Sequence, residues 1–376
     1  MKLKDLSVNI FSGGTPSTKN EKFWNGEFYW LSSGETKNSY IRKTEKTITK
    51  LGVEKSSTRL AKIGDIVIAS AGQGKTRGQV AYCLTDTYIN QSIIAIRTKK
   101  ELLNSKYLFY NLSSRYNELR LLSDSSSSRG SLTVKIFEEL DIDLPKIEKQ
   151  NKIAKILSNY DDLIENNNKR IKILEEMAQK IYKEWFVDFK FPGHETATFR
   201  QTKLGSEVMP KKGKNITKAT IKEGNVPVVA GGIEPAYYHN VPNTIAPVIT
   251  VSASGANAGY INLYHNDIWA SDCSFIDSTM TPYVYYYYLL LKYNQVKVTN
   301  MQRGAAQPHV YPQDLAQLKF DIPDENVIKK FNDLIAPIFE QIANLTIKNT
   351  NFKQIRDLLL PRLISGEIDV EKLEIL

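Results

Sequence analysis

The chain has 376 residues, of which 41% are hydrophobic and 24% are charged, with 50 lysines and arginines against 41 acidic residues. This length favours two globular units over a single core, and the hydrophobic content excludes an intrinsically disordered chain. The net charge of +9 is compatible with a polyanionic partner. The two cysteines, Cys83 and Cys273, are isolated, which excludes a disulfide framework and a zinc knuckle.

The sequence contains no candidate membrane segment. Its start lacks an apolar signal core, and no run of about eighteen apolar residues occurs. The densest apolar run, residues 283–291, is short and rich in tyrosine, as in a core helix. We therefore expect a cytoplasmic protein without membrane contact.

The first globule is predicted from short strands, turns and one helix. Its candidate strands lie at residues 28–31, 64–70, 80–84 and 93–97. Apolar spacing predicts a helix over 106–122, serine content predicts a loop over 123–131, and a closing strand is expected over 140–145.

A long helix follows, with an apolar residue at alternating spacings of four and three. The seam comprises Ile153, Leu157, Tyr160, Ile164, Ile171, Leu174 and Ile181, with Asn167 among them. This spacing is typical of a coiled coil. From Ile153 to Trp185 the helix would be about 50 Å long.

The same order recurs in the second half, at an offset of roughly 180. A strand, a glycine turn, a tyrosine-rich helix, a polar loop and a closing strand precede a second seam, made of Phe331, Ile335, Ile338, Ile342, Leu345, Phe352 and Leu359. The seam offset is 178, from Ile153 to Phe331. Asn167 and Asn349 interrupt the seams, either as buried register devices or as points of loose, wet packing. Pro337 predicts a kink.

We therefore expect an α+β fold with an internal pseudo-twofold repeat. Two globular α/β domains would be separated by two long helices packed as an antiparallel coiled coil. The predicted boundaries are 1–146 for the first globular domain, 147–190 for the central helix, 191–324 for the second globular domain, and 325–376 for the C-terminal helix and tail.

Residues 69–76 end in Gly-Lys-Thr and superficially match a phosphate-binding loop. That signature needs glycine where Ala69 stands and a helix after Thr76, but the following residues predict a strand. A glycine-rich hairpin is the simpler interpretation. In a functional version of it, Lys75 and Arg77 contact DNA phosphates or base edges.

Polar loops at the same place in each half are the stronger candidates for DNA contact. Arg129 and Arg303 each precede a glycine, and an arginine there can bind guanine with two hydrogen bonds. In the same manner Gln302, Gln307 and Asn257 can read adenine, and Ser128 is a further candidate for DNA contact. The alternative is that these are solvated loops.

No catalytic or metal-binding motif is present. The four histidines are scattered, no acid and base pair has a recognisable context, and the exocyclic-amine methyltransferase motif is absent. We expect no active site and no metal in this chain. Two other functions remain open, a protein-binding scaffold built on the coiled coil and a nucleotide hydrolase using Lys75.

Two phrases carry a family resemblance. With residues 143–150, Asp-Leu-Pro-Lys-Ile-Glu-Lys-Gln, before the first long helix, and residues 360–368, Leu-Pro-Arg-Leu-Ile-Ser-Gly-Glu-Ile, after the second, the chain resembles the specificity subunit of type I restriction-modification systems. The resemblance covers nearly the whole length. It departs at residues 323–326, where a glutamine-ended phrase is expected.

The resemblance implies a non-catalytic DNA reader within an adenine-N6 methyltransferase and restriction endonuclease complex. Its two globular domains would be target-recognition domains for the halves of a bipartite site in double-stranded DNA, with the helices setting the spacer. Two methyltransferase subunits would dock on the helices and bring S-adenosylmethionine. Motor-nuclease subunits, where present, would bring ATP and Mg. The chain itself would bind no cofactor.

Overall fold

The computed structural model describes residues 1–72, 74–126, 130–304 and 308–372. It divides into two compact units, one of Met1–Glu165 with Thr350–Leu376 and the other of Asn166–Asn349. Each unit therefore contains one globule together with one end of both long helices.

The first unit is built on two sheets. The five-stranded sheet has the order β1 (Ser7–Ser12), β9 (Ile93–Thr98), β6 (Ile66–Ala69), β7 (Val80–Cys83) and β3 (Tyr40–Ile41). The four-stranded sheet has the order β4 (Lys46–Ile48), β2 (Trp24–Leu31), β8 (Thr87–Ile89) and β5 (Arg59–Ala61). β6 and β7 are short apolar strands with every residue buried. The short helices of this unit are α1 (Leu3–Leu6), α2 (Lys50–Glu54), α3 (Ser105–Ser114), α4 (Tyr116–Ser126) and α5 (Val134–Glu138).

The second unit repeats this plan with smaller sheets. Its main sheet has the order β11 (Lys211–Lys212), β17 (Cys273–Asp277), β14 (Val248–Ser252) and β15 (Ile261–Tyr264). Smaller sheets pair β13 (Tyr237–His239), β12 (Val226–Val229) and β16 (Trp269–Ala270), and β10 (Phe199–Lys203) with β18 (Lys319–Pro323). The short helices are α7 (Leu204–Glu207), α8 (Val284–Tyr293), α9 (Gln295–Thr299) and α10 (Pro312–Ala316).

The pairing of the strands confirms the predicted internal repeat. The order β9, β6, β7 recurs as β17, β14, β15, and all of these neighbours are antiparallel. In the smaller sheet of the first unit, β2 is parallel to β8 and antiparallel to β4. In that of the second unit, β12 is likewise parallel to β16 and antiparallel to β13. The two halves thus share a frame whose connections differ in length.

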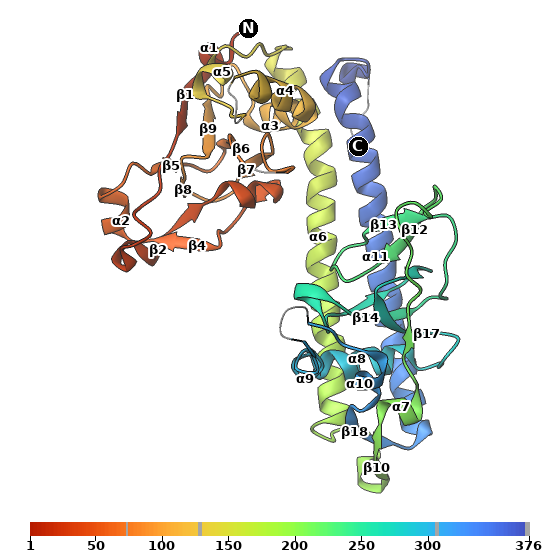
Figure 1. Ribbon diagram of the computed structural model, residues 1–376. Helices are drawn as coiled ribbons and strands as arrows, with labels where there is room; N and C mark the ends of the chain where they lie inside the picture. The colour runs from red at the N-terminus through yellow and green to blue at the C-terminus, as the bar shows by residue number, and fades with distance from the viewer. Residues whose placement is uncertain (73, 127–129, 305–307, 373–376) are drawn as a thin grey trace. The chain divides into compact units, whose positions relative to one another are not determined.

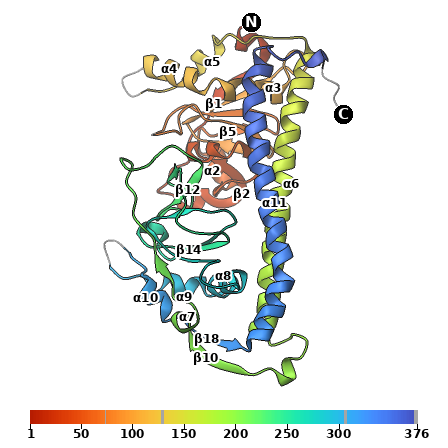
Figure 2. The same ribbon diagram turned by 90° about the vertical axis from the view of Figure 1, so that its right-hand side faces the viewer.

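The two long helices are α6 (Ile147–Phe186) and α11 (Glu325–Ile364), each of 40 residues. A rise of 1.5 Å per residue makes each about 60 Å long, more than the predicted 50 Å. They run antiparallel, because in the first unit Tyr160 packs on Phe352 with ring centroids 6.1 Å apart, and in the second Trp185 packs on Phe331 at 5.5 Å. Figure 2 shows them side by side.

The helices bury the stripe that the seam predicts. Each seam residue is buried or half-buried, and α11 passes through the exposed Pro337 without an interruption in its helical assignment. Seam residues also form part of the core of each globule. Ile153 and Leu157 lie in the core of the first unit, whereas Phe331, Ile335 and Ile342 lie in that of the second.

Three local predictions for the first globule are wrong in whole or in part. The helix expected over 106–122 is broken at Arg115 into α3 and α4, and α4 continues to Ser126, inside the segment predicted as a loop. Leu119 and Leu122 pack into the core and hold α4 there despite its serines. Residues 140–145 form no strand, only a bridge from Asp141 to Lys2.

Candidate nucleic-acid interface

In the first unit, two polar connections meet at one end of the main sheet. We call them the first loop pair: residues 70–79 between β6 and β7, and residues 127–133 between α4 and α5, of which 130–133 are described. Leu132 donates its N–H to the carbonyl of Ser70 at 2.9 Å. This backbone bond fixes the start of the hairpin turn against the loop that follows α4.

Arg77 is an internal tie of the first loop pair. Its side chain is nearly buried, donates from Nη1 to the Gly130 carbonyl at 2.8 Å, and forms an ion pair with Asp124 on α4. Charge-assisted bonds of this kind are among the stronger ones in proteins. The guanidinium therefore positions the two loops, and its contact with DNA stays a prediction.

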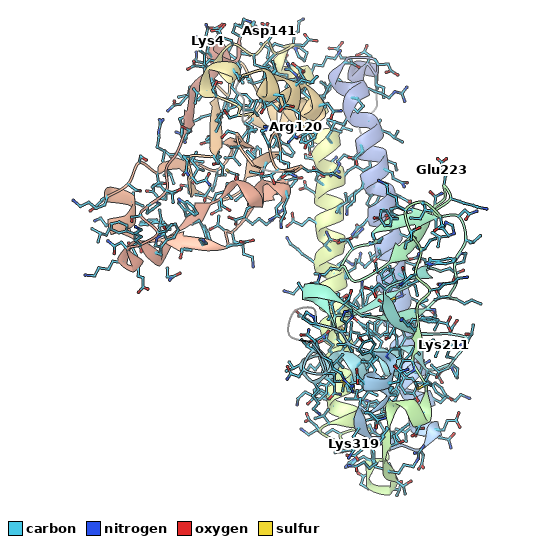
Figure 3. All side chains as sticks on the ribbon, in the orientation of Figure 1. Lys4, Arg120, Asp141, Lys211, Glu223 and Lys319 are labelled. Atoms are coloured by element: carbon cyan, nitrogen blue, oxygen red, sulfur yellow. The ribbon has the colours of Figure 1, made fainter. Side chains whose placement is uncertain are left out.

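Two side chains of helix α4 donate hydrogen bonds to the backbone of the turn at residues 70–79. Tyr116 donates its hydroxyl to the Lys75 carbonyl at 2.9 Å, and Arg120, labelled in Figure 3, donates from Nη1 to the Gly74 carbonyl at 2.8 Å. These bonds hold the backbone of Lys75 while its side chain stays exposed. A cavity of about 310 Å³ beside it is lined by Lys37 as well as Lys75, so two lysines border one hollow.

The second unit contains the corresponding second loop pair. It comprises residues 253–260 between β14 and β15, and residues 300–311 between α9 and α10, described except for 305–307. Val310 donates its N–H to the Ala253 carbonyl at 3.0 Å, which repeats the bond from Leu132 to Ser70. Gly255 adds a second backbone bond, to the Pro308 carbonyl at 3.2 Å.

Arg303 differs from Arg77 in its exposure. Its backbone exchanges two hydrogen bonds with His309, of 2.8 and 2.9 Å, and its guanidinium pairs with the buried Asp314. Its side chain is nevertheless 72% exposed. The arginine is thus anchored at one edge while the rest of its five-donor fork faces solvent, an arrangement that suits contact with a phosphate or a guanine edge.

The structure brings most of the predicted contact residues together in these two pairs. Lys75 and Arg77 lie on the first, whereas Asn257, Gln302 and Arg303 lie on the second. Gln302 donates its amide to the Ala258 carbonyl at 2.8 Å, which links the two loops. The predictions for Ser128, Arg129 and Gln307 lie outside the described residues.

The sequence did not indicate the residues that hold these loops. Asp124, Arg120 and Tyr116 act from α4, and their partners are more than 40 positions away along the chain. Asp314 follows its partner Arg303 by 11 positions but lies on α10. The available signal was the recurrence of a glycine-rich turn and a polar loop in each half.

The described residues contain no candidate metal site. Within residues 1–72, 74–126, 130–304 and 308–372, no three His, Cys, Asp or Glu side chains are grouped so that they could hold a metal ion. No helix in that same part of the chain is long and apolar enough to cross a membrane. Cys83 and Cys273 are buried free thiols, and burial raises the pKa of Cys273 to about 12.

A family model described as the type I restriction modification DNA specificity domain matches residues 1–176 and again residues 201–359. The chain belongs to this family. The two matches correspond to the two halves of the internal repeat, so each half of this specificity subunit carries one target-recognition domain. The resemblance drawn from the motifs at residues 143–150 and 360–368 is confirmed.

Similar proteins support the assignment over the whole length. The specificity subunit of the type I restriction enzyme MjaIX from Methanocaldococcus jannaschii is 28% identical over 409 aligned residues, covering 99% of this chain and 94% of the relative. The EcoR124I/EcoR124II specificity subunit from Escherichia coli is 29% identical over 50% of this chain and 47% of its own. The crystal structure of an S subunit from M. genitalium matches with a TM-score of 0.62 and 18% identity, covering 96% of this chain and 95% of the other, which shows the shared fold.

Proposed function

We propose that this specificity subunit reads a bipartite site in double-stranded DNA in the cytoplasm, each loop pair reading one half. The main support is a backbone hydrogen bond that recurs in both units, from Leu132 to Ser70 and from Val310 to Ala253. In each unit it joins the two loops of the pair beside the same order of strands. The side chains presented on that frame differ, with Lys75 on one and Arg303 on the other. A shared frame with different polar side chains fits two readers of different sequences.

In this proposal α6 and α11 set the separation of the half-sites and carry two methyltransferase subunits. Support for docking comes from apolar side chains on the outer faces of the helices, each between 41% and 69% exposed: Ile173 and Met177 on α6, Ile355 and Leu358 on α11. The methyltransferase subunits would supply S-adenosylmethionine and the adenine-N6 chemistry. Motor-nuclease subunits, where present, would supply ATP and Mg, and the chain itself would bind no cofactor.

The assignment of loop pairs to half-sites is tested by two substitutions in the assembled methyltransferase. Lys75→Ala should relax or weaken recognition of one half-site, and Arg303→Ala that of the other, by about 1–3 kcal/mol for a lost base contact. Mapping methylated adenines across a genome reads both halves at once. Lys348→Ala, on an exposed turn of α11, is the matched charge control. Equal disturbance of both halves by either loop variant would contradict the assignment.

The spacer role is tested by lengthening both helices. Four matched residues inserted in each add roughly 6 Å of helix. The unread spacer should then grow by about two base pairs at roughly 3.4 Å each. An unchanged spacer in the methylation map would contradict the ruler role and leave the reading of half-sites untouched.

A protein-binding scaffold without a DNA role is the competing function, and the exposed apolar side chains of the helices favour it. The two differ in salt dependence. DNA binding that neutralises several phosphates weakens steeply between 50 and 200 mM salt. A duplex shift assay with the methyltransferase subunits present separates them, since a pure scaffold gives no shift at any salt concentration.

A further inference from the structure

The two main sheets end differently. In the first unit the sheet ends with β3, which pairs in parallel with β7 through Tyr40 opposite Tyr82 and Ile41 opposite Cys83. In the second unit the sheet ends at β15, and no described strand pairs with its outer edge. An unpaired edge is a template for another extended chain.

The hydrogen bonds at the turns give the correspondence between the two sheets. The N–H of Ala69 donates to the carbonyl of Gln79, and the carbonyl of Ala69 accepts from the N–H of Gly78. Ser252 makes the same two backbone bonds with Tyr260 and Gly259, so Gln79 corresponds to Tyr260. Counted from this shared pair, β7 residues Tyr82 and Leu84 correspond to Leu263 and His265. On the helices the offset of 178 matches Asp161 with Phe339 and Glu165 with Ala343.

Four groups hold the β3 segment in the first unit. Tyr82 and Leu84 donate their N–H groups to the carbonyls of Ser39 and Ile41, both at 2.9 Å. Tyr40 donates its hydroxyl to Asp161 at 2.6 Å, and Arg42 forms an ion pair with Glu165. The strand therefore fills the space between the edge of β7 and helix α6.

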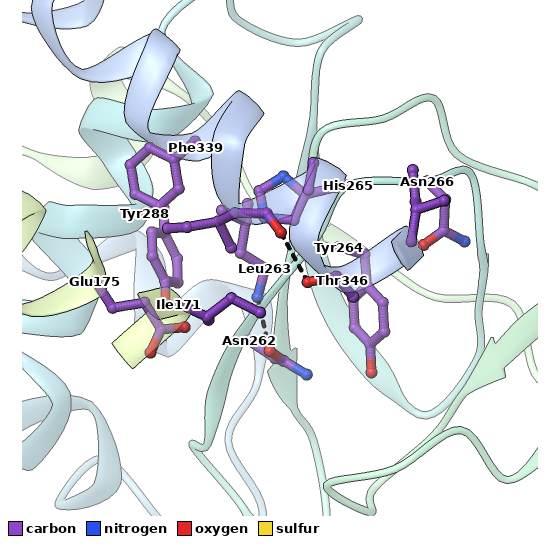
Figure 4. A pocket seen from close by; sticks show the side chains of 13 residues that line it. Ile171, Glu175, Asn262, Leu263, Tyr264, His265, Asn266, Tyr288, Phe339 and Thr346 are labelled. Carbon is purple, nitrogen blue, oxygen red and sulfur yellow. Dashed lines mark hydrogen bonds between the residues drawn. The ribbon is translucent and has the colours of Figure 1, made fainter. Parts of the chain in front are cut away.

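All four counterparts of these groups line one cavity in the second unit. Leu263, His265, Phe339 and Ala343 border a space of about 250 Å³ between β15 and the long helices (Figure 4). The place that β3 fills in one unit is thus a hollow in the other.

The part of the chain that the structure describes places no strand of its own in this hollow. In the first unit β3 lies within the connection from β2 to β4, residues 32–45. The equivalent connection, from β12 to β13, is residues 230–236 and is half as long. It forms no strand beside β15.

The cavity offers both backbone and apolar contacts. The N–H of Leu263 donates to the side chain of the adjacent Asn262, at 2.9 Å, and no described residue accepts from the N–H of His265. On α11, Phe339 and Ala343 stand where α6 carries Asp161 and Glu165, so this wall is apolar. Phe339 stacks on Tyr285 with ring centroids 4.6 Å apart, and Glu175 is the carboxylate that lines the cavity from α6. Tyr288 and Ile342 complete this wall.

We propose that this cavity binds an extended segment of a partner polypeptide, which adds a parallel strand to the edge of β15 and places an aliphatic side chain against Phe339. The segment repeats the backbone pairing of β3, with an apolar residue at the position of Tyr40, since a tyrosine hydroxyl there would lack the acceptor that Asp161 provides. The proposal is independent of whether the loop pairs read DNA.

The first test uses a synthetic probe and the full chain. The probe is a fluorescent peptide of residues 36–45 carrying Tyr40→Leu, so that it copies β3 with the expected anchor. It should bind in fluorescence anisotropy and slow deuterium exchange at residues 261–266. The same peptide with Tyr40→Asp should bind at least tenfold more weakly, because a carboxylate would be desolvated against Phe339. Absence of binding, or equal binding of both peptides, would overturn the proposal.

The second test fills the cavity. Ala343→Phe places a ring in the hollow and should abolish binding of the leucine probe, whereas Lys348→Phe, at an exposed position outside the cavity, should leave it unchanged. Ala343→Leu is a smaller substitution with the same expected direction, should the phenylalanine variant unfold in circular dichroism. Binding of the probe that persists in both Ala343→Phe and Ala343→Leu would show that it does not bind in this cavity. A dimer of the free chain that disappears in Ala343→Phe would show that a second copy is the occupant, which also overturns the proposal.

Discussion

Asn167 donates from Nδ2 to Oδ1 of Asn349 at 2.9 Å, and both side chains are more than nine-tenths buried between α6 and α11. Asn349 in turn donates to Oδ1 of Asn168 at 2.8 Å. The amides therefore satisfy one another inside an otherwise apolar seam. Of the two interpretations left open by the sequence, this geometry supports a register device, because a helix shifted by one turn would bury both amides without partners.

Removal of one asparagine should cost more than removal of both. Asn349→Leu leaves the buried amide of Asn167 without its acceptor and should lower the free energy of unfolding by about 1–3 kcal/mol. The pair Asn167→Leu with Asn349→Leu should recover most of this loss. Urea unfolding of the three chains measures the coupling. A double variant less stable than Asn349→Leu alone would contradict the mutual satisfaction of the pair.

Gly130 should be indispensable to the first loop pair. It has φ +60, and a Cβ there would lie 1.8 Å from Nη1 of Arg77. Gly130→Ala should therefore displace the guanidinium and weaken recognition of one half-site while sparing the other. Gly74→Ala is the matched control, since its φ is +59 and a Cβ there meets nothing within 4 Å. Both variants carry the same backbone strain of about 1 kcal/mol, so a methylation map in which they behave alike would refute the role of Arg77 as a tie.

Asp161 should contribute more to the stability of the first unit than its partner Arg356. The buried carboxylate accepts hydroxyl bonds from Tyr40 at 2.6 Å and Tyr110 at 2.5 Å and pairs with Arg356. Asp161→Leu removes the acceptor of all three and should cost about 3–5 kcal/mol. Arg356→Met leaves two hydroxyl donors on the carboxylate, and its cost should be about 1–2 kcal/mol. Denaturant unfolding ranks them, and the reverse order would refute this account.

His265 should make the second unit sensitive to acid. Burial beside Phe339 and Tyr285 lowers its pKa from 6.5 to about 4, so the folded chain keeps the ring neutral where the unfolded chain protonates it. Between pH 6.5 and 4 the unfolded state therefore binds more protons than the folded state. The free energy of unfolding decreases by about 2 kcal/mol as the pH is lowered through that window. Glu175 is the titratable carboxylate lining the same cavity, and burial raises its pKa.

The His265 effect is isolated by comparing unfolding at pH 7 and pH 4.5 in the native chain and in His265→Gln. The glutamine variant should lose less stability on acidification, because it cannot take up the proton. Glu175→Gln serves as the companion variant for the neighbouring carboxylate. An equal loss in the native chain and in His265→Gln would assign the acid sensitivity to other groups.

The long helices and the repeat could be predicted because their signals are local. An apolar residue every three or four positions specifies a helical stripe, and the same stripe at Ile153 and Phe331 reveals the repeat. The extent of α4 could not be predicted in this way. Its serines favour a loop locally, and what holds it includes the ion pair of Asp124 with Arg77, which lies 47 positions away along the chain.

The candidate interface was predicted in outline only. Exposed polar loops can be located from composition, but whether an arginine faces solvent depends on distant partners. Arg77 and Arg303 look alike in the sequence, yet one is nearly buried against Gly130 and the other is 72% exposed. The open edge of β15 was equally hidden, because it follows from the shortness of residues 230–236.

The boundary between the two compact units falls within the two long helices, after Glu165 and after Asn349, and this bears on how such chains could recombine. Asp161 pairs with Arg356 within the first unit, and Trp185 packs on Phe331 within the second. A chimaera of two related chains, spliced after Glu165 and after Asn349, would therefore inherit each set of contacts whole. Splices at the helix ends would instead separate residues such as Asp161 from the partners with which they were selected.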